Sequence, residues 1–196
     1  GIFTFGKDAR EAYERMIEMV SLAESRLRQG RPIVFSARAL AAASASAAEI
    51  APIIRGAVAM KRESAEPIRF IANFRTAPEI LSYVNGAELA SYSQRGVVTP
   101  DHIIRTKNKP LVVPPPETGR LDDFAGAVRA GVAKFIADYD AYFACENEAA
   151  GNTKTKLDPM PRVVLVPGVG VFGLGRTAKD ASIAADAQLH TTMADD

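Results

Sequence analysis

The chain has 196 residues, 47% of them hydrophobic, with 24 basic and 23 acidic side chains and a formal net charge of +1. This composition supports a globular fold with a real core, and the balanced charge provides no field to recruit nucleic acid or an acidic membrane surface. Charges interrupt every apolar run well before the ~20 residues of a membrane span. The lone Cys145 cannot form an internal disulfide and no segment resembles a signal peptide, so we expect a cytoplasmic protein without nucleic-acid or membrane partners.

The first twelve residues return near the other end of the chain as residues 170–181. Five of the twelve positions are identical and most others hold similar residues. Each copy is typical of a short strand, a glycine turn and the start of a helix, with Asp8 and Thr177 as N-caps. Residues 2–5 predict a buried strand at the very start of a chain that lacks an initiator Met, which indicates a piece of a longer protein.

Strand and helix signals alternate through the rest of the chain. Residues 39–48 are almost all Ala and Ser, which favours close-packed helix over a flexible linker, and a helix is expected to begin near Pro52. A second is expected after an N-cap at Thr76. Apolar runs predict strands at residues 32–35, 68–71, 111–113 and 162–166, and helical spacing predicts helices at residues 8–30, 76–86, 87–92 and 122–142.

The segment Thr99–Lys107 holds the densest group of polar side chains. Its Thr-Pro-Asp start is turn chemistry, and two isoleucines that we expect to be buried indicate that a strand or short helix follows. His102, Arg105 and Lys107 are candidate substrate-binding residues, an anion-binding or acid/base group. The alternative is a capped turn, in which the histidine bonds backbone and the two cations are solvated.

A glycine pattern precedes the last helix. Residues 168–173 fit G-x-G-x-x-G after a strand, which raises a nucleotide-binding module at Gly168–Gly175 as an alternative. The helix begins later than that fingerprint requires, and no second strand follows to supply an acid for the ribose. With two His and one Cys widely separated, a self-contained zinc site is not expected either. We therefore assign no catalytic, cofactor-binding or metal-ligating residue.

Three segments, Gly1–Glu24, Thr99–Lys107 and Arg162–His190, together resemble the bifunctional rhamnulose-1-phosphate aldolase/alcohol dehydrogenase family. In that family a zinc-dependent class II aldolase/adducin domain is followed by a connecting region and then a short-chain dehydrogenase. The resemblance implies that this chain is the end of the aldolase domain plus the connecting region. It also implies that zinc and NAD(P) are bound by the flanking domains, which would be this segment's partners.

These observations predict an α/β fold with a mixed or mostly parallel sheet of about four to six strands covered by helices. We expect one compact domain in which residues 1–30 close an aldolase-like domain, residues 31–161 connect, and residues 162–196 form a second, degenerate strand–helix unit. The expected function is a structural connecting domain without chemistry of its own, in a protein that forms homo-oligomers. The first alternative is a contribution by Thr99–Lys107 to a neighbouring active site, and the second is the nucleotide-binding module.

Overall fold

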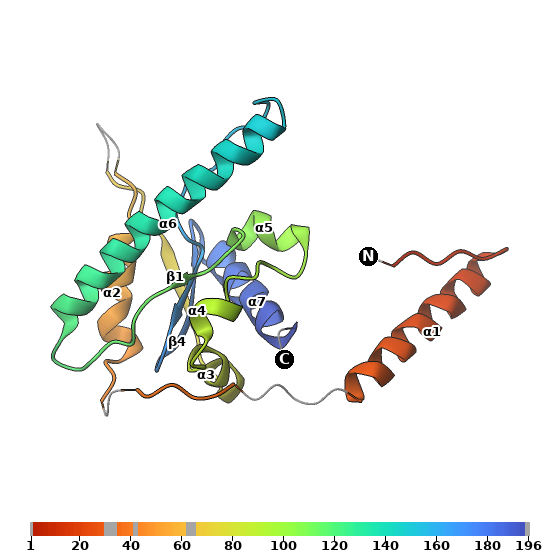
Figure 1. Ribbon diagram of the computed structural model, residues 1–196, viewed down its shortest axis with the longest axis horizontal. Helices are drawn as coiled ribbons and strands as arrows, with labels where there is room; N and C mark the ends of the chain where they lie inside the picture. The colour runs from red at the N-terminus through yellow and green to blue at the C-terminus, as the bar shows by residue number, and fades with distance from the viewer. Residues whose placement is uncertain (1, 30–34, 41–42, 62–65, 195–196) are drawn as a thin grey trace. The chain divides into compact units, whose positions relative to one another are not determined.

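The computed structural model describes residues 2–29, 35–40, 43–61 and 66–194, apart from the side chains of Asp101 and of residues 190–194. The chain divides into two compact units, Gly1–Val34 and Phe35–Asp196, and Figure 1 shows the elements of each. Within these described ranges, no helix is both long enough and apolar enough to cross a membrane.

The first unit is dominated by one helix, α1 (Ala9–Arg28). The Asp8 side chain accepts a hydrogen bond from the backbone N of Glu11 (2.8 Å), and the Glu11 carboxylate accepts one from the backbone N of Lys7 (2.8 Å). The predicted N-cap is therefore confirmed. None of the residues of α1 is buried, so its apolar side chains are presented outward within this unit.

The predicted strand at residues 2–5 is wrong for this unit. The segment is extended but unpaired, and Ile2, Phe3 and Phe5 are 63–84% exposed. A strand forms only where a neighbour takes its backbone N–H and C=O groups. The described residues of the first unit contain no such neighbour.

The second unit is built on a four-stranded mixed sheet, as predicted. Its strands are β1 (Ile71–Arg75), β2 (Leu111–Val112), β3 (Val163–Val166) and β4 (Gly170–Gly175), in the order β1-β4-β3-β2. Strand β4 is antiparallel to both β1 and β3, and β2 is parallel to β3. The fold class is α/β, and within the described sheet only β2 and β3 form a parallel pair.

Helices cover both faces of this sheet (Figure 1). One face packs against α2 (Ala47–Ala57) and α6 (Leu121–Ala149) through a core that includes Val164 and Val166. Val163 and Leu165 alternate to the other face and share a core with α3 (Pro78–Val84), α4 (Leu89–Tyr92) and α7 (Ala178–Ala194). A short helix, α5 (Pro100–Thr106), packs against α7.

Several local expectations need correction. Residues 39–40 and 43–46 are not helical; α2 begins at Ala47, ahead of Pro52, because Ser46 and Glu49 form a reciprocal capping box. Helix α3 has Ala77, not Thr76, as its N-cap. Of the strand predicted at residues 32–35, residues 32–34 lie outside the described residues. The strand predicted at residues 68–71 begins only at the last of these residues.

The second copy of the repeat forms β4 and the start of α7. A Cβ on Gly173 would lie 2.5 Å from the backbone N of Ala185 and overlap the carbonyl O of Ala181. No side chain fits there, so glycine at this position lets the helix approach the strand closely. Strand β4 is buried along its whole length.

Candidate functional site

The segment Thr99–Lys107 forms α5, one of the two structures that the sequence allowed. Thr99 is extended, with φ −137°, and Pro100 starts the helix with its fixed φ. The helix ends at Thr106, and the next residue, Lys107, has a φ of +67°, outside the helical region. Ile103 and Ile104 are 42% and 70% exposed, so the prediction that both are buried is wrong.

His102 is held within its own helix. Its Nδ1 lies 2.6 Å from the Thr99 Oγ1, and its backbone carbonyl accepts a hydrogen bond from the Thr106 Oγ1 (2.9 Å). Both contacts fasten one turn of α5 to the next. The predicted alternative of a capped turn with two solvated cations is not confirmed, because Thr99 makes no side-chain cap hydrogen bond and Lys107 is buried.

Lys107 is buried, with 5% of the residue exposed. Its Nζ donates a hydrogen bond to the backbone O of Asp158 (2.5 Å) and lies 4.2 Å from the centre of the Tyr139 ring. Burial lowers the pKa of Lys107 to about 8; the Asp158 carboxylate opposes this shift and the Arg162 guanidinium adds to it. The amine joins the end of α5 to α6 and to the loop before β3.

Arg105 is exposed and lines a pocket of about 160 Å³, which we call the arginine pocket. Arg162 and Arg176 line the same pocket, together with Ile104, Leu174, Gly175 and Asp180. The three candidate residues therefore make separate contacts: His102 within α5, Lys107 in the interior, and only Arg105 at the pocket.

Sequence reasoning missed Arg162 and Arg176, although a signal was present. Arg162 directly precedes β3 and Arg176 directly follows β4, and these strands are antiparallel neighbours. The start of one such strand meets the end of the other. A backbone hydrogen bond from the N of Leu174 to the O of Arg162 (2.7 Å) fixes this approach.

One carboxylate, that of Asp158, ties two of the arginines together. Its Oδ2 lies 2.5 Å from the Nη2 of Arg162 and 3.7 Å from the Nη2 of Arg176. The guanidinium of Arg162 also lies over the Phe70 ring, 4.7 Å from its centre. Arg162 is only 17% exposed, whereas the Arg176 side chain is 54% exposed and reaches toward solvent. The pocket thus has one largely buried cation, Arg162, and two exposed ones, Arg105 and Arg176.

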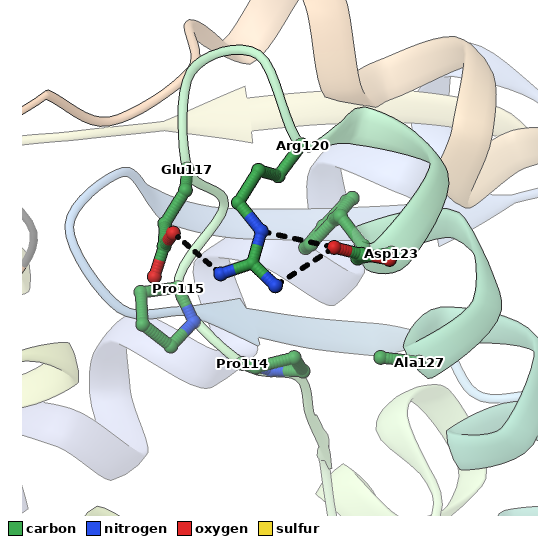
Figure 2. A pocket seen from close by; sticks show the side chains of 7 residues that line it. Pro114, Pro115, Glu117, Arg120, Asp123 and Ala127 are labelled. Atoms are coloured by element: carbon green, nitrogen blue, oxygen red, sulfur yellow. Dashed lines mark hydrogen bonds and ion pairs between the residues drawn. The ribbon is translucent and has the colours of Figure 1, made fainter.

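A second pocket gives an arginine a different setting (Figure 2). Pro114, Pro115, Phe124 and Ala127 surround Arg120, which bonds both Glu117 (3.1 Å) and Asp123 (2.9 Å). These two acids raise the pKa of Arg120. Because both acids already hold the guanidinium, this pocket offers no unbalanced positive charge for a ligand.

The glycine pattern at residues 168–173 does not form a dinucleotide-binding turn, so the alternative at Gly168–Gly175 is wrong. Its first two residues belong to the turn of the β3–β4 hairpin, and the other four are part of strand β4, not of a helix. A Cβ on Gly168 would lie 3.0 Å from the Ser44 Oγ, and the space beside Gly173 is filled by α7. A pyrophosphate needs the backbone to be open at these positions.

Among the described side chains, no group of three or more His, Cys, Asp or Glu residues is placed to share a metal ion. The residues present therefore do not fit a zinc centre within the described part of this chain.

Comparison with known proteins adds two findings. Residues 45–194 match the family model described as the second domain of class II aldolases. A protein of Bacillus subtilis (strain 168) named uncharacterized oxidoreductase YuxG is 29% identical to this chain over 185 residues, which cover 90% of the chain and 26% of that protein. The chain thus spans about a quarter of the length of that relative. No solved structure matched.

Proposed function

The chain belongs to the family of class II aldolase second domains, and from this premise we propose that it is a connecting domain without chemistry of its own. In this proposal it joins a class II aldolase domain to an oxidoreductase domain of the same polypeptide, a sugar-phosphate aldolase fused to a short-chain dehydrogenase. Two comparisons support it: the family is named as the second domain of an aldolase, and the matched relative is a longer protein named as an oxidoreductase.

The observation that carries the proposal is the separation of the three candidate side chains. A binding constellation has to converge on one space, whereas His102 bonds within α5, Lys107 is buried against Asp158, and Arg105 lines the arginine pocket alone of the three. The faces of the sheet are filled by apolar side chains. In this proposal the main role of Thr99–Lys107 is to stabilise the fold.

Zinc and NAD(P) belong, in this proposal, to the flanking domains. The described residues here offer neither a three-ligand group nor an open glycine turn. The exposed apolar side chains of the first unit, among them Phe3, Phe5 and Tyr13, are suited to pack against the flanking aldolase domain, because burying such side chains stabilises an interface.

The test uses the full-length polypeptide that carries this chain. His102→Ala and Arg105→Ala are each assayed for aldol cleavage of a ketose 1-phosphate and, separately, for NAD(P)-dependent alcohol oxidation, and each is checked by thermal unfolding. A connecting role predicts that both activities survive, or fall only together with the unfolding temperature. Loss of one activity at an unchanged unfolding temperature would instead place Thr99–Lys107 in an active site.

A further inference from the structure

We propose that the arginine pocket is a binding site for a phosphate-bearing anion, of the size of inorganic phosphate or a phosphomonoester. This site goes beyond the connecting role and does not depend on it. Its cations come from three separate places in the chain: Arg105 from α5, Arg162 from the start of β3, and Arg176 from the turn between β4 and α7. The fold thus brings together three guanidinium groups that are far apart in the sequence.

The local charge is not balanced. Three guanidinium groups are near only two carboxylates, those of Asp158 and Asp180. The amine of Lys107, which is bonded to the backbone O of Asp158, adds a further positive charge. The Asp180 Oδ2 accepts a hydrogen bond from the Thr177 Oγ1 (2.8 Å), so this carboxylate is engaged at the start of α7. Among the described side chains, Arg105 has no ion pair; the side chain of Asp101, one turn earlier, lies outside the description.

The geometry suits phosphate better than a smaller anion. Guanidinium groups donate in planar forks, and phosphate presents several oxygens that accept such forks at once. Arg162 is held in place by Asp158, by the Phe70 ring and by a hydrogen bond from its Nη1 to the backbone O of Met160 (3.4 Å), so it fixes one positive charge at the pocket wall. Arg105 and Arg176 line the same pocket and are exposed, so an anion in solution can reach both guanidinium groups.

The contrast with Arg120 shows what distinguishes this pocket. Arg120 also lines a surface pocket, but Glu117 and Asp123 bond its guanidinium from both sides (Figure 2). An anion there would have to displace one of these acids. Arg120 therefore serves as a matched control, an exposed arginine in a pocket that is already neutralised.

The experiment titrates the 196-residue chain with inorganic phosphate at constant ionic strength and pH 7.5, following the phosphorus resonance by NMR. Arg105→Gln and Arg176→Gln are compared with Arg120→Gln, and circular dichroism verifies that each is folded. We expect saturable binding by the wild type, a Kd raised at least about tenfold by each of the first two changes, and an unchanged Kd for Arg120→Gln. Both test positions are exposed, so their loss of binding does not follow from unfolding.

Three results would overturn the site. These are no saturable binding by the wild type, a Kd unaffected by both Arg105→Gln and Arg176→Gln, or an equal loss in Arg120→Gln. A further titration replaces phosphate with acetate at the same ionic strength. Acetate binding as tightly as phosphate would overturn the phosphate assignment and point to a carboxylate of a protein partner.

Discussion

The two copies of the repeated segment, residues 1–12 and 170–181, fold alike in one half and differently in the other. In both, a capping side chain binds a backbone N three residues on: Asp8 to Glu11 (2.8 Å) and Thr177 to Asp180 (3.1 Å). In both, a glycine packs against the first helical turn: a Cβ on Gly6 would lie 2.8 Å from the Cβ of Glu11. The same contact recurs in the second copy, where a Cβ on Gly175 would lie 2.6 Å from the Cβ of Asp180.

The strand halves differ. Residues 170–175 are buried and paired on both sides, by β1 and by β3, whereas residues 2–6 are extended, mostly exposed and unpaired within their unit. The turn and cap depend on atoms within a few residues of one another, so the sequence alone determines them. The strand depends on neighbours distant in the chain. Within one sequence motif, the turn and cap are thus determined by local interactions, and the strand is determined by residues distant in the chain.

The largest expected effect comes from making the second copy like the first. Gly173 corresponds to Thr4, and Gly173→Thr would place a β-branched side chain where Ala181 and Ala185 already touch the strand. We expect the second unit to lose about 3 kcal/mol or more of unfolding free energy, because neither backbone can move away. Urea denaturation followed by circular dichroism measures this loss.

The reciprocal change, Thr4→Gly, is the matched control. It removes the hydrogen bond from the Thr4 Oγ1 to the carbonyl O of Ala12 (2.7 Å) in the first unit and should leave the urea midpoint of the second unit unchanged. A stability of Gly173→Thr close to that of the wild type would show that α7 does not need the close approach, and the glycine would then have no packing role.

The same division explains which expectations succeeded. The caps of α1 and α7, the strand at β3 and the long helix α6 follow from local signals and were predictable. The strand at residues 2–5 failed because its partner is not encoded in its own residues. The arginine pocket was found only through Arg105, since Arg162 and Arg176 meet by the pairing of β3 with β4. Recognising that hairpin from Pro167 and Gly168 would have brought both arginines together.

The next largest effect is a pH dependence of the unfolding free energy that arises from Lys107. This residue is buried and bonded to the backbone O of Asp158, whose carboxylate pairs with Arg176 of the second copy. Its native pKa of about 8 lies below the 10.5 of an unperturbed lysine. Between these values the unfolded chain binds more protons, so stability rises with pH. From pH 8 to 9.5 we expect the wild type to gain about 1.5 kcal/mol relative to Lys107→Met.

Urea denaturation of both proteins at several pH values measures this difference. The range stops at pH 9.5 because tyrosines begin to ionise above it, and burial raises the pKa of Tyr139. Lys134→Met, which removes an exposed lysine paired with Asp138 (2.7 Å), should show the same pH slope as the wild type. Parallel curves for the wild type and Lys107→Met would mean that the amine is solvated in the native state.

The smallest expected effect concerns the helix cap, which both copies of the repeated segment share. Removing the cap by Thr177→Ala should cost the second unit about 1 kcal/mol, and Thr177→Ser, which keeps the hydroxyl, should restore it. Asp8→Ala removes the equivalent cap, yet it should change only hydrogen exchange in the first turns of α1 and not the unfolding of the second unit. If Asp8→Ala lowered the stability of the second unit as much as Thr177→Ala does, the two copies would be energetically coupled. Residues 2–6 would then have to be paired in solution, as residues 170–175 are. The two copies would in that case differ in sequence but not in structure.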